Sequence, residues 1–124
     1  SLFGVECDVA IEGESSFLDG HKAINFYSIA REAAFNAVSH GKATKVEVEL
    51  VCDIAGISLK VIDNGIGFEE EDKDNGFGMG VNIMRLRAEV LGAAFEMGPR
   101  YGGGTVVSCT CGRGKGCRER GFYY

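Results

Sequence analysis

The chain has 124 residues, of which 45 % are hydrophobic and 25 % charged, values typical of one compact globular domain. No apolar stretch approaches the roughly 18–20 residues of a membrane span, and no basic segment followed by an apolar run marks a retained signal peptide. The formal net charge is −5; residues 112–124 hold four basic residues and one acidic residue (+3), so residues 1–111 carry −8. This acidic body argues against nucleic-acid binding, because contacts with phosphates require clustered Lys and Arg.

Five cysteines, an odd number, are spread along the chain. Cys7 and Cys52 lie in strand-like sequence, whereas Cys109, Cys111 and Cys117 cluster toward the end. The cluster has no partner His and no C-x-x-C pair, which disfavours a zinc site. We therefore expect reduced thiols in a cytoplasmic protein.

In the first half of the chain, alternating apolar residues predict strands on either side of one helix. Residues 3–11 alternate, which predicts a strand with one buried face. After a polar stretch, Asp19 is a suitable N-cap for a helix that ends near residue 39. Residues 44–52 alternate again, and a short turn leads into a third strand over 57–62, so these two strands are expected to form an antiparallel hairpin.

The second half begins with a glycine-rich segment from residue 63 to 80, whose length is typical of a functional lid. A second helix is predicted over about 81–91, ended by Gly92, and strands follow over 93–97 and 104–111. Together the elements predict an α/β (α+β) two-layer sandwich, with a mixed, mostly antiparallel sheet and helices on one face.

The first predicted helix has an apolar side and a polar side. Each side spans an arc of about 100° or less, with Ile24, Tyr27, Ala34, Phe35 and Val38 on the first and Asn25, Glu32, Asn36 and His40 nearly opposite. A solvated face is the simplest interpretation of the polar side. Asn36 departs from it, because Asn is a poor helix former that usually lies at helix ends. An Asn oxygen suits Mg²⁺, and Glu32, one turn away, could orient a water or accept a proton.

Two glycine-rich stretches suggest a nucleotide site. Asp63-Asn64-Gly65-Ile66-Gly67 directly follows a predicted strand; it is either a tight turn or a site in which Asp63 accepts an exocyclic amine such as that of adenine. Gly76-Phe77-Gly78-Met79-Gly80 precedes the second helix, whose free N–H groups favour phosphate. Neither the dinucleotide spacing nor a P-loop ending is present. Gly102 to Thr105 opens the last strand and is also compatible with a hairpin loop.

In their order along the chain, four segments resemble the N, G1 and G2 boxes and the final Gly-Thr of the GHKL ATPases. They are Glu32-x-x-x-Asn36-x-x-x-His40-x-Lys42, Asp63-x-Gly65-x-Gly67, Gly76-x-Gly78-x-Gly80 and Gly103-Gly104-Thr105. This superfamily includes histidine kinases, DNA gyrase B, the ninety-kilodalton heat-shock chaperones and MutL. Residues 30–40 and 84–92 further resemble bacterial sensor kinases of the nitrate-sensor and desaturase-sensor type.

The resemblance implies the Bergerat ATPase fold and a site for ATP and Mg²⁺. Asn36 would ligate Mg²⁺ between the ATP phosphates, and Glu32 would be the nearby catalytic carboxylate. His40 and Lys42 would lie near the phosphates. Positioning and charge neutralisation are the main requirements of phosphoryl transfer, so this small set of groups is chemically sufficient.

The remaining boxes would bind the base and cover the phosphates. Asp63 would accept the adenine amine, supported by Thr105, and Gly65 and Gly67 would shape the base pocket. The lid and phosphate loop would be formed by Gly76, Gly78, Met79 and Gly80.

The resemblance also implies a partner. The phosphoacceptor histidine of such kinases lies on an upstream dimerisation helix, in a pattern absent here, and His21 and His40 belong to the nucleotide-binding half. Residues 1–111 are expected to form a catalytic domain and residues 112–124 a flexible basic tail. This fragment would be a cytoplasmic monomer that binds ATP–Mg²⁺ without phosphorylating itself. The full-length protein would be a homodimer that phosphorylates a response regulator; in a membrane-bound sensor this domain would be its cytoplasmic part.

Two other functions remain open at this point. A GHKL protein-serine kinase of the anti-sigma-factor type would share the boxes, although the stretch over 84–92 argues against it. A non-catalytic nucleotide-binding regulatory module would be expected to have lost Glu32 or Asn36, and both are present.

Overall fold

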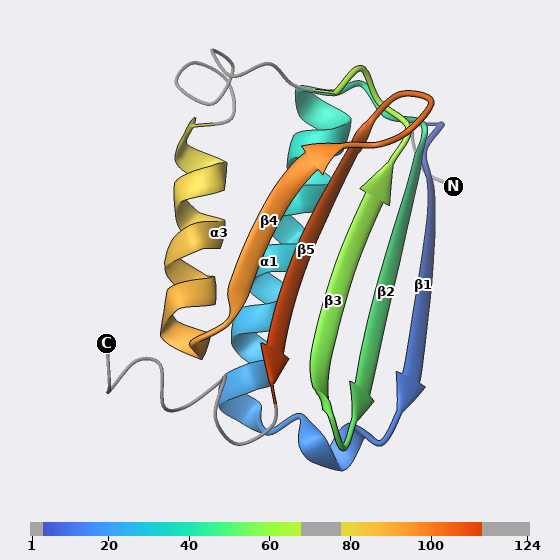
Figure 1. Ribbon diagram of the computed structural model, residues 1–124. Helices are drawn as coiled ribbons and strands as arrows, with labels where there is room; N and C mark the ends of the chain where they lie inside the picture. Colours follow the sequence, from blue (N-terminus) through green and yellow to red (C-terminus); the bar gives the residue numbers. More distant parts are fainter. Residues whose placement is uncertain (1–3, 68–77, 113–124) are drawn as a thin grey trace.

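The structure, a computed structural model, describes residues 4–67 and 78–112 as two layers, a sheet and a pair of helices on one of its faces (Figure 1). The described elements, in chain order, are β1 (Glu6–Gly13), the short 3-10 helix η1 (Ser15–Phe17), α1 (Gly20–Ser39), β2 (Lys45–Asp53), β3 (Gly56–Asp63), α3 (Gly78–Leu91), β4 (Ala94–Pro99) and β5 (Thr105–Gly112). The predicted two-layer sandwich is therefore confirmed.

The five strands form one sheet in the order β1-β2-β3-β5-β4. Only the β1–β2 pair is parallel, and the other three pairs are antiparallel. The predicted hairpin of β2 and β3 is present, with Leu50 opposite Leu59. In the turn between these two strands, the Asp53 carboxylate accepts hydrogen bonds from the backbone N–H groups of Ala55 and Gly56 at 2.8 and 3.2 Å.

Local signals explain where the helices begin and end. Asp19 caps α1, accepting a hydrogen bond from the Lys22 N–H at 2.9 Å. Gly92 follows α3 with φ of 68°, a left-handed conformation that glycine adopts without strain. α3 begins at Gly78, three residues before the predicted start, so the last glycines of the lid segment belong to the helix.

The core lies between the helices and one face of the sheet. Its fully buried side chains come from both layers, and the largest are Ile29, Met84, Leu91, Val46 and Val61. Buried and partly exposed residues alternate along β5, as the sequence predicts for a strand with one covered face. The core therefore holds β3 and β5 in the middle of the molecule, beneath the two helices.

The expectation of a buried face on the first strand is wrong. Every residue of β1 is exposed, including Val9 at 63 % and Ile11 at 66 %. β1 is an edge strand, and the helices lie over β2, β3, β5 and β4. A strand beyond this cover keeps its alternating pattern but buries little of it.

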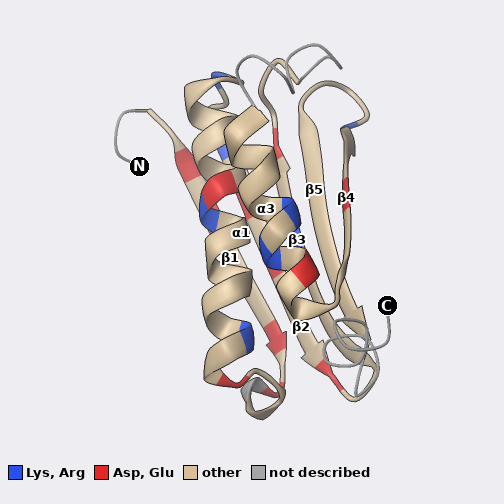
Figure 2. Cartoon of the chain, turned by 90° about the vertical axis from the view of Figure 1, so that its left-hand side faces the viewer, with Lys and Arg blue, Asp and Glu red and all other residues tan. Residues whose placement is uncertain are grey.

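α1 does not pack through its apolar arc. Ile24, Tyr27 and Phe35 are 61–69 % exposed, whereas Asn25 and Asn36 on the polar side are buried. The helix contacts both the sheet and α3, and the arc between these two neighbours contains polar residues alongside Ile29 and Ala33. Figure 2 looks onto the helix layer, where uncharged stretches of α1 separate a few charged residues.

Cys7, Cys52 and Cys109 are free thiols, as expected. Cys111, near the end of β5, is disulfide-bonded, so the expectation of reduced thiols is wrong there. No helix in the described ranges is long and apolar enough to cross a membrane.

Candidate nucleotide site

A cavity opens between the two helices and the end of the sheet at which β3 stops and β5 begins. Its lining comes from α1, α3, three strands and two loops: Ala33, Asn36, Ala37, Gly41, Asp63, Gly67, Met84, Met97, Thr105 and Val107. Four of these residues, Asn36, Asp63, Gly67 and Thr105, were singled out from the sequence. The cavity thus brings together members of three separate sequence boxes.

Asn36 presents an unpaired amide to this cavity. Its side chain is 5 % exposed, and its Nδ2 atom is buried without a hydrogen-bond partner among the described residues. A Cβ atom at Gly80, in the first turn of α3, would lie 2.9 Å from Nδ2 and 3.0 Å from Oδ1. Gly80 therefore leaves the room that the amide occupies, and a buried amide without a protein partner is suited to a polar ligand.

Asp63 is the second buried polar group of the cavity. It is 7 % exposed and lies at the end of β3, opposite Thr105 of β5. Its Oδ1 accepts a hydrogen bond from the Gly65 N–H at 2.7 Å. Burial raises the pKa of this carboxyl, while the hydrogen bonds from the Gly65 and Thr105 backbones and the charge of Arg100 oppose that rise. A carboxylate in this setting gains from a ligand that donates a hydrogen bond.

The glycines next to Asp63 allow two loops to meet closely. A Cβ at Gly65 would lie 2.5 Å from the carbonyl oxygen of Gly41, in the turn that follows α1. Gly67 has φ of 82°, which favours glycine. The Ile66 N–H donates to the same Gly41 oxygen at 2.8 Å. Asp63 and the end of α1 are consequently parts of one wall.

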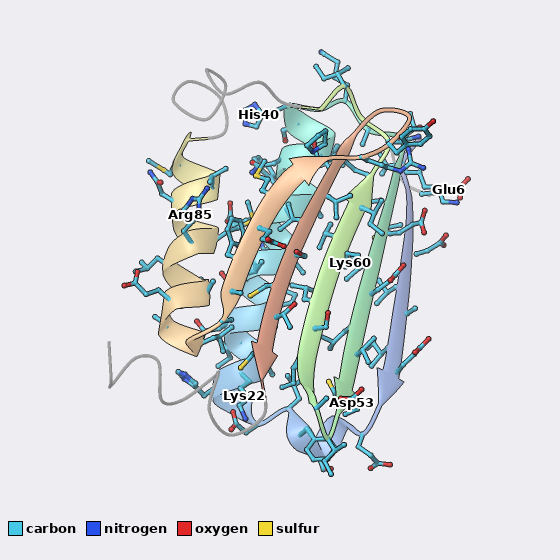
Figure 3. The ribbon with its side chains drawn as sticks, in the orientation of Figure 1. Glu6, Lys22, His40, Asp53, Lys60 and Arg85 are labelled. Atoms are coloured by element: carbon cyan, nitrogen blue, oxygen red, sulfur yellow. The ribbon has the colours of Figure 1, made fainter. Side chains whose placement is uncertain are left out.

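The other predicted site residues surround the cavity without lining it. Glu32 is half-buried on α1, one turn before Asn36. His40 caps the C-terminal end of α1, where Figure 3 labels it, and Lys42 follows, exposed, with φ of 54°. Gly78 and Met79 begin α3, and the Met79 side chain is 78 % exposed. Gly76 lies outside the described residues.

The sequence missed the apolar walls of the cavity. Met84 was assigned only to the second helix and its kinase-like stretch, Met97 and Val107 only to strands, and Gly41 was not singled out. Small and apolar residues at a cavity look like core residues in a sequence. Gly41 could have been found from its position directly after His40, the last residue of the polar side of α1.

Among the described residues, no three His, Cys, Asp or Glu side chains gather to hold a metal ion. A cation near Asn36 would therefore need most of its oxygen ligands from elsewhere, such as phosphates and water. This is the way in which proteins commonly hold Mg²⁺, which retains water and substrate oxygens in its coordination shell. The amide of Asn36 fits that limited role.

Residues 21–114 match the model of one protein family, described as histidine kinase-, DNA gyrase B-, and HSP90-like ATPase. The nitrate/nitrite sensor protein NarQ of Escherichia coli is 39 % identical over 92 residues, which cover 73 % of this chain and 16 % of NarQ. The sensor histidine kinase LiaS of Bacillus subtilis is 34 % identical over 103 residues, covering 83 % of this chain and 27 % of LiaS. The chain thus spans less than a third of either relative.

Solved structures are similar as well. The ATP-binding domain of PrrB from Mycobacterium tuberculosis superposes with a TM-score of 0.58 and 26 % identity, over 68 % of this chain and 64 % of that one. A blue-light activated histidine kinase from Erythrobacter litoralis shares the fold, with a TM-score of 0.67 and 23 % identity over 86 % of this chain and 35 % of that one. The chain therefore belongs to the histidine kinase-, DNA gyrase B-, and HSP90-like ATPases, as an ATP-binding catalytic domain of the two-component sensor histidine kinase type.

Proposed function

We propose that this chain binds ATP together with Mg²⁺ in the cavity between α1, α3 and the sheet, and that within a longer kinase it donates the γ-phosphoryl group to a histidine on a separate dimerisation domain. The unpaired, buried amide of Asn36 is the observation that best supports the proposal. Leaving such a group without a partner costs about 1–3 kcal/mol. The unpaired atom, Nδ2, is a donor, so a ligand oxygen such as one of a phosphate offsets this cost by accepting its hydrogen bond.

Asn36 would contact the phosphate end of the nucleotide and Asp63 the adenine end. The Asn36 oxygen would be a ligand of Mg²⁺, which neutralises charge on the phosphates during transfer. Asp63 would accept a hydrogen bond from the adenine amine, and its own hydrogen bond from Gly65 holds the carboxylate in place for this. The apolar side chains of Met84 and Met97 provide walls suited to a flat base.

The phosphates would lie toward the start of α3. The first N–H groups of a helix have no partner within the helix, and the helix dipole favours anions there. Gly78, Met79 and Gly80 form this end, with Gly80 directly beside Asn36. Glu32, one turn from Asn36, would serve as the catalytic carboxylate that orients or accepts a proton. His40 caps the C-terminal end of α1 and Lys42 follows it, and both side chains would lie near the phosphates.

The acceptor histidine would come from another domain. His21 lies in the first turn of α1 and His40 at its opposite end, and both belong to the nucleotide-binding domain itself. We expect this chain alone to bind ATP–Mg²⁺ without phosphorylating itself. The longer protein would act as a homodimer on the cytoplasmic side and pass the phosphoryl group to a response regulator.

Calorimetry on Asn36→Ala tests the site, with Asn25→Ala as a matched control. Asn25 is a buried amide on the same side of α1, but the protein satisfies it: Nδ2 donates to the His21 carbonyl at 2.9 Å, and Oδ1 accepts from Arg87 at 3.3 Å. Asn36→Ala should weaken Mg²⁺-dependent ATP binding at least about tenfold, since interactions with charged groups contribute about 1.5–3 kcal/mol. Asn25→Ala should lower the free energy of unfolding and leave the ATP affinity unchanged.

Unchanged affinity in Asn36→Ala would favour a non-catalytic module that holds nucleotide in another way. Incubation of the wild-type chain with γ-labelled ATP gives a second test. Acid-labile phosphohistidine on the isolated chain would contradict the proposed need for a separate acceptor domain. Phosphorylation of a protein serine would instead favour the anti-sigma-factor type of kinase.

A further inference from the structure

We propose that Asn64 is a positioning residue for the nucleotide: it fastens the loop after β3 to the turn after α1, so that Asp63 and Gly41 line the cavity in a fixed arrangement. The inference rests on the proposed nucleotide site. Asn64 itself is exposed and does not line the cavity. Its effect on a ligand would therefore pass through the two loops that it joins.

The Asn64 side chain holds three groups of the segment that follows α1. Its Oδ1 accepts hydrogen bonds from the backbone N–H groups of Thr44 and Lys45, both at 2.9 Å. Its Nδ2 donates to the Thr44 hydroxyl at 3.0 Å. The Asn64 N–H adds a fourth bond, to the Lys45 carbonyl at 3.2 Å. An amide that uses both its oxygen and its nitrogen in this way fixes the relative position of two segments nearly twenty residues apart.

The turn held by Asn64 has an unusual backbone. Lys42 has φ of 54°, and it is the one non-glycine residue with positive φ in the described part of the chain. Side chains disfavour this conformation, so the surrounding contacts must maintain it. Ala43, the next residue, is buried and its N–H donates to the Ala37 carbonyl at 2.8 Å. The hydrogen bonds of Asn64 secure the turn on its other side.

The same two loops meet at the cavity. The Ile66 N–H donates to the Gly41 carbonyl at 2.8 Å, and Gly65 lies against that carbonyl so closely that a Cβ would meet it at 2.5 Å. Gly65 also donates to Asp63, so a displacement of Gly41 would pass directly to the carboxylate. Asn64 thus closes a ring of contacts of which Asp63 and Gly41 form the side that faces the cavity.

Asp53 offers a matched control. A side-chain oxygen of Asp53, like that of Asn64, accepts hydrogen bonds from two backbone N–H groups; they are those of Ala55 and Gly56, in an exposed turn. That turn lies at the opposite end of the sheet from the C-terminal end of α1, as the labels of Asp53 and His40 in Figure 3 show. Asn64→Ala and Asp53→Ala therefore remove similar interactions at different distances from the cavity.

The two variants should differ in nucleotide binding and in local exchange. We expect both to lower the melting temperature by similar amounts. Asn64→Ala should raise the Kd for ATP–Mg²⁺ by about three- to tenfold, because only part of the energy of the three lost hydrogen bonds acts on the cavity through the loops. It should also speed hydrogen exchange at the Ile66 amide in nucleotide-free protein. Asp53→Ala should leave both quantities at their wild-type values. Asn64→Asp retains an acceptor oxygen and should restore protection at Ile66.

Wild-type affinity and wild-type exchange at Ile66 in Asn64→Ala, with stability lowered as in Asp53→Ala, would overturn the proposal and leave Asn64 a purely structural residue. If Asn64→Ala does not fold, Thr44→Val removes only the hydroxyl that Nδ2 meets, and the same two measurements decide. If the wild-type chain binds no ATP, the proposed function fails. Exchange at Ile66 still shows, without nucleotide, whether Asn64 positions the loops.

Discussion

Gly80→Ala separates binding from stability at the centre of the site. A Cβ at this position would lie 2.9 Å from Nδ2 and 3.0 Å from Oδ1 of Asn36, closer than side-chain carbons normally approach such atoms. The amide must move to make room, because its neighbour is the first turn of α3. If Asn36 contacts the nucleotide, the added methyl group should weaken ATP–Mg²⁺ binding, although Gly80 itself does not line the cavity.

Gly80→Ala should change the stability little and the nucleotide affinity strongly. Alanine in a helix is more favourable than glycine by up to about 1 kcal/mol, which offsets the crowding at Asn36, so the free energy of unfolding should stay within about 1 kcal/mol of wild type. Loss of one interaction with a charged group, about 1.5–3 kcal/mol, should weaken ATP–Mg²⁺ binding roughly 10- to 150-fold. Calorimetric titration and thermal unfolding measure the two quantities on the same protein.

Gly20→Ala provides the control for this substitution. Gly20 begins α1, and a Cβ there meets nothing within 4 Å. This variant should unfold at the wild-type temperature or slightly above it and bind ATP–Mg²⁺ normally. Wild-type affinity in Gly80→Ala would refute the reasoning, because Asn36 could then be displaced without consequence for the nucleotide.

Two further predictions concern buried ionisable groups. Burial raises the pKa of Asp63, so at neutral pH the charge of this carboxylate opposes folding, and the destabilisation develops as pH rises from the ordinary aspartate pKa through the raised one. Asp63→Asn should therefore keep or raise the melting temperature at pH 7 and lose adenine binding. A large fall in the melting temperature would contradict this sign. Burial raises the pKa of Cys109 to about 12, and at pH 8 only about one such thiol in ten thousand is ionised. Alkylation followed by peptide mass spectrometry should thus modify exposed Cys7 and spare Cys109 and Cys52 in the folded protein; rapid labelling of Cys109 would show that the strand opens.

The parts of the fold that the sequence predicted well depend on local signals. Asp19 determines the start of α1 by capping it, and Gly92 ends α3 in a left-handed conformation. The hairpin of β2 and β3 likewise requires only a short turn between two alternating runs. The burial of β1 was mispredicted, because it depends on the sheet order, which places this strand beyond the helices.

For the site, polar residues in unusual places were the informative signal. Asn36 was chosen because Asn is a poor helix former in mid-helix, and Asp63 because a carboxylate at a strand end can accept an exocyclic amine; the structure brings both to one cavity. Gly41 and Met84 gave no such signal, since a small or apolar residue is equally at home in the core. Asn64 was hidden in a different way: beside a glycine it is typical of a turn, and only the fold shows that its side chain reaches the segment after α1.

The solvated face that is the simplest interpretation of the polar side of α1 is not what the structure shows. A helix that served only as cover would bury Ile24 and Tyr27, yet these are exposed, and two amides are buried in their place. One of them, Asn25, is satisfied by the protein and joins α1 to Arg87 of α3. The other, Asn36, is buried at similar depth with its Nδ2 unpaired. Burying two amides weakens the packing of α1 in return for a fixed contact between the helices at Asn25 and an amide ready for the proposed nucleotide at Asn36.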